Sequence, residues 1–573
     1  MPRTPGNEAR QALARGAICS LLATASPLDA EPVFVEVGGE AGLEFTHING
    51  MVGERWLAEI MGAGVAVLDF DGDDMLDVWL VQGGPLHDTS GELPCDRLFR
   101  NVSAEVGELK FVDVTGESGV CASGYGMGVA TADIDLDGDL DVFVANFGPN
   151  QLYENLGDGR FRDATAGAGL RHDDWSVSAS FADLDGDLLP ELFVANYVDW
   201  TVATHKVCRD DAGSPSYCSP EVYRPSVDRL YRNRGGFEFV EIGAESGIGA
   251  VRGAGLGVIA HDFDADRDSD FYVANDMNEN RLWVNQGGRR FVDSALLAGV
   301  AVNGDGNVEA SMGIDAEDFD HDCDIDIFVT HLAAQTNTLY ANEGDGWFAD
   351  RTNVHGAAAA SIPFTGFGTG WFDADNDGDL DLFAANGAVT AITGQDPGPL
   401  GLPLRQRNQF WRNDGGRYTE IRIPAFEPAE VSRGTAFADF DNDGDLDILV
   451  TNNRGPARLY RNDSDGGHWI GFEVVDSSAP GSEVWLESVG CGARRVSTDG
   501  SYASANDPRV LFGLGENESP QRARVRWPDG EVHAFGPLDA DRYHILARRR
   551  AANPAVPGPG ALRPTTGGVG QSP

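Results

Sequence analysis

Residues 126–146 read GMGVATADIDLDGDLDVFVAN and contain the pattern that decides the fold. Small residues come first, a nine-residue Asp-rich loop follows, and an apolar, β-rich run ends the stretch. The loop pattern is D-x-D-x-D with a further acid at position 9. It occurs seven times along the chain, so internal repetition is the first feature to explain. The seven loops begin at Asp69, Asp133, Asp183, Asp262, Asp318, Asp373 and Asp439.

Two further motifs accompany each loop. A strand-like motif such as RLFRN, QLYEN or RLWVN follows every loop, and an FxD motif such as FVDVT or FRDAT comes after it. Each repeat of 50 or more residues therefore contains four short strands separated by turn residues, which is typical of a β-propeller blade. The sequence predicts an all-β fold, a seven-bladed β-propeller followed by a small β-rich C-terminal domain.

The last blade lacks its fourth strand. Seven loops and seven LYxN-type motifs occur, but only six FxD motifs follow them. The N-terminal stretch FVEVGGEAGL, residues 34–43, supplies the missing motif. We expect it to form the outer strand of the seventh blade and to close the ring, because closure removes open sheet edges.

The acids of each loop are arranged as ligands for a hard cation. Calcium takes six to eight oxygens, and carboxylates at positions 1, 3, 5 and 9 of a tight loop, with the carbonyl of position 7, can converge on one ion. An EF-hand needs its last acid at position 12 and helices on both sides, so these loops are a different kind of site. In the second loop the carbonyl is that of Asp139, and Gly138 permits the turn. The sequence predicts up to seven Ca²⁺ ions.

The same positions give the predicted ligands of all seven loops. The carboxylates assigned are Asp69, Asp71, Asp73 and Asp77; Asp133, Asp135, Asp137 and Asp141; Asp183, Asp185, Asp187 and Glu191; Asp262, Asp264, Asp266 and Asp270; Asp318, Asp320, Asp322 and Asp326; Asp373, Asp375, Asp377 and Asp381; and Asp439, Asp441, Asp443 and Asp447. The second, sixth and seventh loops keep Gly at position 6 and are expected to bind best. Asp74, Leu188, Arg267 and Cys323 stand there in the others.

Charge supports this assignment. The chain has 91 acidic and 42 basic residues, a formal net charge of −49, and the loops hold 34 of the acids, five each except four in the third. Carboxylates packed so closely repel one another unless a cation binds. The acidity also excludes nucleic acid and anionic lipid as partners, and 42% hydrophobic residues exclude general disorder.

The N-terminus indicates export. Arg3, Arg10 and Arg15 precede the short apolar run GAICSLLATA, and small residues follow, so residues 1–31 are predicted to be a signal peptide. The alternative is an untidy N-terminus or a misplaced start codon. No later segment is long and apolar enough to insert into a membrane. We expect a secreted or periplasmic protein.

Six cysteines lie beyond the predicted signal, and none form a CxxC pair. Cys208 and Cys218 are ten residues apart in one loop, so a disulfide between them is expected in an oxidising compartment; two free thiols are the alternative. The pairing of Cys95, Cys121, Cys323 and Cys491 stays open.

The loops and their flanking residues resemble FG-GAP repeats of the VCBS type, as in integrin α-subunit propellers. MGAGVAVLDFDGDDMLD, MGIDAEDFDHDCDIDIFVTHL and SRGTAFADFDNDGDLDILVTN are similar to the cartilage acidic protein 1 family. HWIGFEV, DGSYASANDPRVLFGLG and VRWPDG resemble its C-terminal ASPIC/UnbV module. The resemblance implies an exported, calcium-binding and adhesive or matrix-associated protein. Together with the predicted signal (1–31), it gives a propeller (32–467) and an ASPIC/UnbV-like domain (468–548), and the Pro- and Gly-rich composition of residues 549–573 predicts a disordered tail.

No catalytic motif was found: HExxH, GxSxG and the P-loop are absent from the sequence. The function predicted is non-catalytic binding or adhesion, with an unidentified extracellular protein or glycan as partner. The alternatives are a polysaccharide lyase or hydrolase with its site at the channel mouth, and a lectin; fold alone does not choose between them. Two long inserts, residues 197–228 and 387–408, are the best interaction candidates, with capping of a blade face as the alternative.

Overall fold

The computed structural model describes residues 32–87, 93–210, 213–398, 401, 403–476 and 479–548. The predicted signal peptide and the predicted tail lie outside these ranges. Within them, strands predominate and the α-helices are single turns, so the all-β propeller prediction is confirmed. No helix in the described part of the chain has the length and apolar character needed to cross a bilayer.

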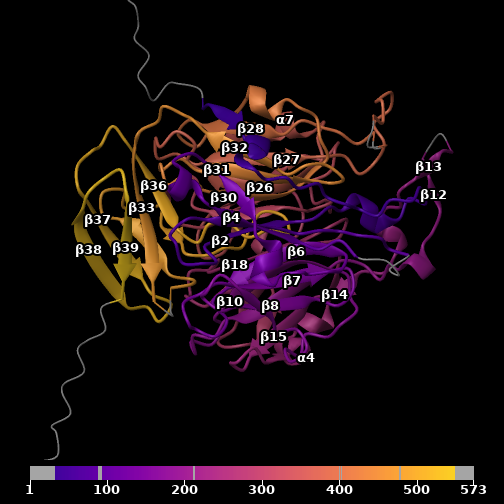
Figure 1. Cartoon of the computed structure of the whole chain (residues 1–573), viewed down its shortest axis with the longest axis horizontal. Coiled ribbons are helices and arrows are strands. Elements are labelled where there is room, and N and C mark those ends of the chain that lie inside the picture. Colours follow the sequence, from indigo (N-terminus) through magenta and orange to yellow (C-terminus); the bar gives the residue numbers. More distant parts are fainter. Residues whose placement is uncertain are drawn as a thin grey trace, which may run out of the picture.

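Seven four-stranded antiparallel sheets, called blades 1 to 7 here, correspond to the seven repeats and are consistent with the predicted number (Figure 1). Their strands, from inner to outer, are β2 (Val65–Leu68), β3 (Asp77–Leu80), β4 (Arg97–Asn101), β5 (Phe111–Asp113); β6 (Gly126–Ala132), β7 (Asp141–Asn146), β8 (Gln151–Asn155), β9 (Phe161–Asp163); β10 (Ser176–Ala182), β11 (Glu191–Asn196), β15 (Arg229–Asn233), β16 (Phe239–Glu241); β18 (Gly255–His261), β19 (Asp270–Asn275), β20 (Arg281–Asn285), β21 (Phe291–Asp293); β22 (Ile314–Glu317), β23 (Asp326–Val329), β24 (Thr338–Asn342), β25 (Phe348–Asp350); β26 (Gly366–Phe372), β27 (Asp381–Asn386), β28 (Gln409–Asn413), β29 (Tyr418–Ile421); and β30 (Ser432–Ala438), β31 (Asp447–Asn452), β32 (Arg458–Asn462), β1 (Phe34–Glu36).

The blades form a closed ring. Each inner strand contacts the inner strands of the two neighbouring blades, and β2 contacts both β6 and β30. Small residues permit this approach: a Cβ on Gly128 would lie 2.0 Å from the carbonyl oxygen of Val177, and one on Gly257 would lie 2.4 Å from that of Met312. The glycines that precede the Asp-rich loops, such as Gly128 and Gly257, are therefore required for packing between inner strands.

The N-terminal strand completes blade 7, as the sequence predicts. β1 pairs with β32, with Phe34 opposite Asn462. The Asn of the LYxN-type motif adds a second tie between blades. Asn101 Nδ2 donates to the carbonyl oxygen of Phe440 at 2.8 Å and so joins blade 1 to blade 7, and Asn233 Nδ2 donates to that of Ile134 at 2.9 Å. Asn155, Asn342 and Asn462 make the same inter-blade bond, so the Asn has a structural cause in five of the seven repeats.

Short helices and two small β-ribbons decorate the blades. The α-helices are α1 (Gly38–Ala41), α2 (Ser103–Val106), α3 (Thr115–Ser118), α4 (Gly243–Ser246), α5 (Ala295–Ala298), α6 (Thr352–His355) and α7 (Ala358–Ser361), and the 3₁₀ turns are η2 (Leu57–Ile60), η3 (Val202–Thr204), η4 (Pro220–Val222), η5 (Ile248–Ala250) and η6 (Pro424–Phe426). The ribbons pair β12 (Cys208–Arg209) with β13 (Pro215–Ser216), and β14 (Ser226–Val227) with β17 (Arg252–Gly253).

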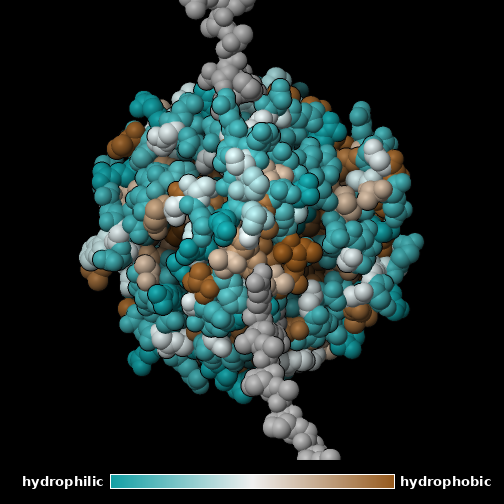
Figure 2. Space-filling model, turned by 90° about the vertical axis from the view of Figure 1, so that its left-hand side faces the viewer, coloured by the Kyte–Doolittle hydropathy of each residue, from teal (hydrophilic) through white to brown (hydrophobic). Residues whose placement is uncertain are grey.

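A C-terminal module follows blade 7 and has its own hydrophobic core, which includes Ile470, Val484 and Trp527. It lies on one side of the ring, yellow in Figure 1, opposite β12 and β13. Figure 2 shows this side as mainly hydrophilic, with small hydrophobic patches. The module's strands are β33 (His468–Val475), β34 (Glu483–Leu486), β35 (Arg494–Arg495), β36 (Val510–Gly515), β37 (Gln521–Arg526), β38 (Val532–Leu538) and β39 (Tyr543–Ala547).

One segment of the module, residues 498–507, enters the centre of the ring; we call it the axial segment. Its hydrogen bonds reach every blade. The partners are Val65 and Val67 in blade 1, Thr131 and Val129 in blade 2, Ser178 and Ser180 in blade 3, Ala260 in blade 4, Ile314 in blade 5, Thr369 in blade 6 and Phe437 in blade 7. The axial segment therefore fills the central channel of the ring.

Tyr502 forms the apolar centre of the axial segment. Its side chain is fully buried and packs edge-on against Phe367, with ring centroids 4.9 Å apart. Its hydroxyl donates to the carbonyl oxygen of Met61 at 3.3 Å. A Cβ on Gly64 would lie 1.6 Å from the carbonyl oxygen of Ala503, so the inner strand of blade 1 also requires glycine beside this segment.

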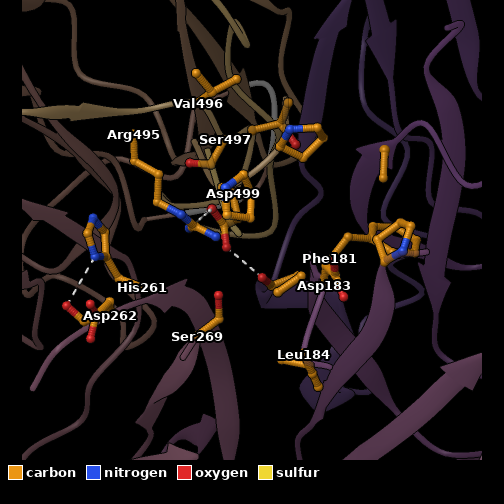
Figure 3. Close-up of a pocket in the computed structure, with 18 of the residues that line it drawn as sticks. Phe181, Asp183, Leu184, His261, Asp262, Ser269, Arg495, Val496, Ser497 and Asp499 are labelled. Atoms are coloured by element: carbon orange, nitrogen blue, oxygen red, sulfur yellow. Dashed lines mark hydrogen bonds and ion pairs between the residues drawn. The ribbon is translucent and has the colours of Figure 1, made fainter. Parts of the chain in front are cut away.

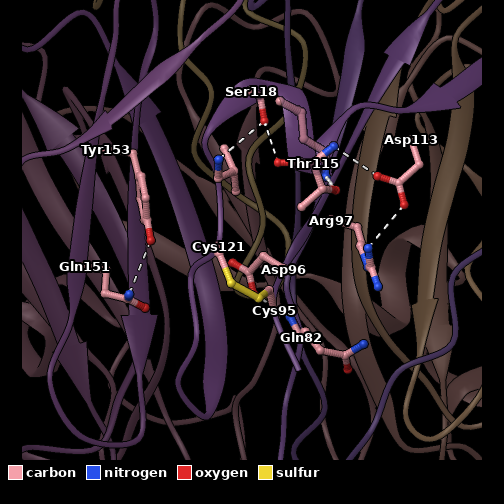
Figure 4. Close-up of a disulfide and its surroundings, with 12 residues drawn as sticks. Gln82, Cys95, Asp96, Arg97, Asp113, Thr115, Ser118, Cys121, Gln151 and Tyr153 are labelled. Atoms are coloured by element: carbon pink, nitrogen blue, oxygen red, sulfur yellow. Dashed lines mark hydrogen bonds and ion pairs between the residues drawn. A yellow bond between two sulfur atoms is a disulfide. The ribbon is translucent and has the colours of Figure 1, made fainter. Parts of the chain in front are cut away.

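Three disulfides occur in the described part of the chain. Cys208 is bonded to Cys218, the pair expected from the sequence, and this bond closes the β12–β13 ribbon. Cys95 is bonded to Cys121 beside the buried carboxylate of Asp96 (Figure 4). Cys323 is bonded to Cys491, which ties the Asp-rich loop of blade 5 to the C-terminal module. The two pairings that the sequence left open are thus assigned.

Candidate functional site

Each Asp-rich loop joins the first and second strands of its blade, and in the first five loops the structure brings three of the acids together. Carboxylate oxygens from positions 1, 3 and 9 lie within 4.8 Å of one another. The groups are Asp69, Asp71 and Asp77; Asp133, Asp135 and Asp141; Asp183, Asp185 and Glu191; Asp262, Asp264 and Asp270; Asp318, Asp320 and Asp326; and two more. These clusters could hold metal ions.

The acids at positions 1 and 9 also build the loop. In blade 2, the two oxygens of Asp133 accept from the backbone N–H groups of Asp137 and Gly138 at 3.0 and 3.1 Å. The oxygens of Asp141 accept from the N–H groups of Ile134 at 2.9 Å and Asn155 at 2.8 Å. These bonds fold the turn and attach it to the third strand of the blade.

The acid at position 3 is different, because one of its oxygens is buried without a hydrogen-bond partner in five of the seven loops. The five residues are Asp71, Asp135, Asp264, Asp375 and Asp441. A buried acceptor left unsatisfied costs about 1–3 kcal/mol, and more when it is charged. Recurrence of the same orphaned oxygen beside two other carboxylates fits a bound cation at each of these loops.

The acid at position 5 has a second role. Asp137 Oδ1 accepts from the N–H of Asp139 at 3.1 Å, and Asp443 Oδ1 accepts from that of Asp445 at 3.0 Å. Position 5 does not belong to the five three-oxygen groups named above. Its carboxylate and the carbonyl of position 7 stay predicted ligands.

Burial makes the position-9 acids hard to ionise in the absence of a cation. It raises the pKa of Asp77, Asp141 and Asp270 to about 8 and that of Asp326 to about 9. Neighbouring carboxylates add to the shift in each case. A divalent cation would favour the charged forms, so metal binding and deprotonation of these acids are coupled.

Arginines from other segments pair with the acids of two loops, and the sequence analysis did not identify them. Arg100 pairs with Asp71 at 2.5 Å and with Asp73 at 2.7 Å in blade 1. In blade 3, Arg289 pairs with Asp185 and lies 3.4 Å from Glu191. A guanidinium at these loops supplies part of the positive charge and competes with a metal ion. One sequence feature could have indicated the role of Arg100: it is the fourth residue of RLFRN, a position that Glu154 occupies in blade 2.

A cavity of about 340 Å³ separates blades 2 to 4 from the C-terminal module (Figure 3). Asp499 of the axial segment lines this cavity, with Oδ1 3.6 Å from Nη1 of Arg495. Its Oδ2 accepts hydrogen bonds from the hydroxyl of Ser180 and the N–H of Ala260. Asp183 and Asp262, the first acids of two loops, border the same cavity. The module is therefore anchored directly beside candidate metal centres.

The histidines near the loops have structural positions. His261 and His331 are buried, and desolvation lowers the pKa of each to about 3. They are neutral at physiological pH, as expected of core residues rather than acid–base groups.

A second pocket, of about 420 Å³, lies at the opposite end of the channel; we call it the channel-mouth pocket. Leu256, Met312 and Phe367 from the centre of the ring line its floor. Both inserts singled out in the sequence line it, through residues 209, 210 and 215–220 of the first and residues 389–391, 403 and 404 of the second. The best interaction candidates thus meet at one site.

Comparison with known proteins identifies the repeats and the module. Residues 133–194, 262–329, 318–384 and 400–450 match the FG-GAP-like repeat, and residues 476–553 match ASPIC and UnbV. Cartilage acidic protein 1 of Mus musculus is 27% identical over 323 residues, which cover 52% of this chain and 46% of the relative. The Homo sapiens protein is 26% identical over 327 residues, which cover 55% and 47%. The predicted resemblance is confirmed, and the chain spans about half the length of the curated relatives it matches.

Similarity to solved structures is weaker. A lectin of Agrocybe aegerita, described as recognising non-reducing terminal N-acetylglucosamine, is 13% identical and matches with a TM-score of 0.39, over 69% of this chain and 87% of that chain. At this TM-score the similarity supports no statement about what the chain binds.

Proposed function

We propose that this chain, a homologue of cartilage acidic protein 1 with FG-GAP-like repeats and an ASPIC and UnbV module, is an exported calcium-binding protein. Its role is adhesion to, or binding of, an extracellular protein or glycan, without catalysis. Up to seven Ca²⁺ ions occupy the Asp-rich loops and stabilise the ring. The C-terminal module is a second domain attached to the propeller through the axial segment, with the boundary near residue 467.

The observation that carries the metal proposal is the orphaned oxygen at position 3. Five loops repeat the same buried, unpartnered carboxylate oxygen, and in three of them, at Asp71, Asp135 and Asp264, the acids of positions 1 and 9 lie within 4.8 Å of it or of its partner oxygen. Calcium is the favoured ion because all the predicted ligands are oxygens and the loops are flexible turns rather than rigid octahedral cages. Without a cation, each loop would bury several like charges at close range.

Export is supported by the three disulfides and by the predicted signal peptide. Disulfides persist in secreted and periplasmic proteins and are rare in the cytosol. Cys323–Cys491 joins two parts of the chain that are 168 residues apart, so it has a role in holding the module against blade 5.

The binding role is supported by the channel-mouth pocket. Inserts on a rigid scaffold are common binding elements, and here two inserts from blades 3 and 6 meet around one pocket. A polysaccharide lyase or hydrolase with its site at this mouth is the second candidate, since the pocket is large enough for a sugar residue.

Two measurements test this function. Metal analysis of the purified full chain after dialysis against metal-free buffer should find several Ca²⁺ per chain, and chelation should remove them. A panel of glycans and extracellular-matrix proteins should then be screened for binding in calcium and in EDTA, and each glycan assayed for new chain ends. Calcium-dependent binding without cleavage supports the proposal. Cleavage of any glycan would replace it with the enzyme alternative, and a chain that retains no metal would refute the calcium sites.

A further inference from the structure

The channel-mouth pocket contains a buried acid that neither the metal loops nor the axial segment uses. Asp276 follows β19 in blade 4 and lines the pocket, yet the residue is only 8% exposed. The surrounding wall is mainly apolar, with Leu256, Met312 and Phe367 on the floor. A carboxyl group in such surroundings requires a partner.

The structure gives Asp276 only half of the contacts that a carboxylate can make. Oδ2 accepts from the hydroxyl of Tyr197 at 2.5 Å, while Oδ1 is buried with no hydrogen-bond partner among the described residues. Desolvation raises the pKa of Asp276 to about 6, so the group is mainly ionised at physiological pH. A buried carboxylate with one hydrogen-bond donor is poorly compensated.

The basic side chains at or near the pocket have other contacts, and Arg209 Nη1 donates to the carbonyl oxygen of Gly213 at 2.7 Å. The guanidinium of Arg433 donates to the carbonyl oxygens of Ile60, Gly387 and Ser432 at 2.7–2.9 Å and lies 3.9 Å from the ring centroid of Phe367. At the rim, the guanidinium of Arg55 lies 5.4 Å from the ring centroid of Tyr217. Within the described ranges no basic side chain forms an ion pair with Asp276. Asp276 therefore has no counter-charge among the described residues.

We propose that the channel-mouth pocket binds a primary ammonium group carried on an apolar stem, with Asp276 as its counter-ion. The ammonium would pair with the carboxylate of Asp276, and the stem would lie against the apolar side chains that line the pocket, such as Leu256 and Met312. The same chemistry occurs in a small free amine and in a lysine side chain of a partner protein. The inference names the ligand chemistry of the binding role proposed above and rests on it.

The first test compares two probes that differ in charge. Benzylamine and benzyl alcohol are titrated into the full chain in calcium, with binding followed by calorimetry. We expect benzylamine to bind at least about thirtyfold more tightly than benzyl alcohol. This factor is the low end of the affinity loss expected when one partner of a buried charge pair is removed. Equal affinities, or no binding of benzylamine, would overturn the proposal. Because this comparison uses the unaltered chain, it does not depend on a variant folding.

Variants and peptides complete the design. Asp276→Asn keeps the shape and the acceptor for Tyr197 and should lower benzylamine affinity by the same factor, while Asp173→Asn, at an exposed acid outside the pocket, should leave it unchanged. Unchanged affinity in Asp276→Asn would refute the assignment.

A lysine peptide and its Nε-acetylated form distinguish the two sources of the ammonium group. Preference for the unmodified peptide indicates a protein ligand, and binding of benzylamine alone indicates a free amine. Metal content and partner binding are measured without amine, so the two proposals fail separately.

Discussion

Replacement of Tyr502 by alanine should destabilise the whole ring, although the residue belongs to the C-terminal module. The side chain is fully buried in the channel against Phe367, and the axial segment around it bonds to all seven blades. Truncation of a large buried aromatic side chain costs about 3–5 kcal/mol. Unfolding entropy near 2.1 cal/mol/K per residue gives about 1 kcal/mol/K for the roughly 500 described residues, so Tm should fall by about 4 °C.

Differential scanning calorimetry in saturating calcium measures this shift. Tyr502→Phe removes only the hydroxyl that donates to Met61, a loss of about 1 kcal/mol or about 1 °C. Trp347→Ala is the control, because the side chain of Trp347 is 61% exposed and its removal should leave Tm unchanged. If Tyr502→Ala melts within 1 °C of the unaltered chain, the axial segment does not stabilise the ring in the way described.

Three further outcomes are expected. Asp135→Asn should reduce the number of bound Ca²⁺ ions by one in native mass spectrometry, because it neutralises an orphaned ligand; an unchanged number would contradict the role of position 3. Arg100→Gln should tighten calcium binding at the first loop by about tenfold in a calcium titration, whereas Arg160→Gln, outside the loops, should have no effect. In EDTA, Tm should fall as pH rises from 6 to 9: folding raises the pKa of acids such as Asp141 to about 8, so their protonated form stabilises the fold at low pH and this stability is lost through pH 8. A Tm that rises over this range would refute the assignment.

The repeating part of the molecule could be predicted because its determinants are local. The loop, the LYxN-type motif and the FxD motif each recur within one blade, and the count of FxD motifs alone placed residues 34–43 in blade 7. Convergence of the acids at positions 1, 3 and 9 also follows from one tight turn. The sequence could not show that position 3 differs from the others, since the burial of Asp135 depends on its neighbours in space.

The rest depends on contacts between distant residues. The axial segment has the sequence of an ordinary loop of small and polar residues, and only the folded ring shows why Gly64 must be glycine beside the Ala503 carbonyl. Cys323 stands in a metal loop and Cys491 in the module, so no spacing rule pairs them. Arg289 belongs to blade 4 but pairs with acids of blade 3. The two inserts were recognised as interaction candidates, but their meeting around Asp276 required the fold.

The most direct test of the account is thermal unfolding of the full chain in calcium and in excess EDTA, with bound metal counted in the same samples. Each filled site adds about 2.7 kcal/mol when free calcium is 100 times its Kd. Filling the five loops with an orphaned oxygen would then add about 13 kcal/mol, which corresponds to a rise in Tm on the order of 10 °C. A loss of this size in EDTA, together with several Ca²⁺ per chain in calcium, is the predicted result. Coincident melting curves and no bound metal would contradict the central claim that these loops are calcium sites.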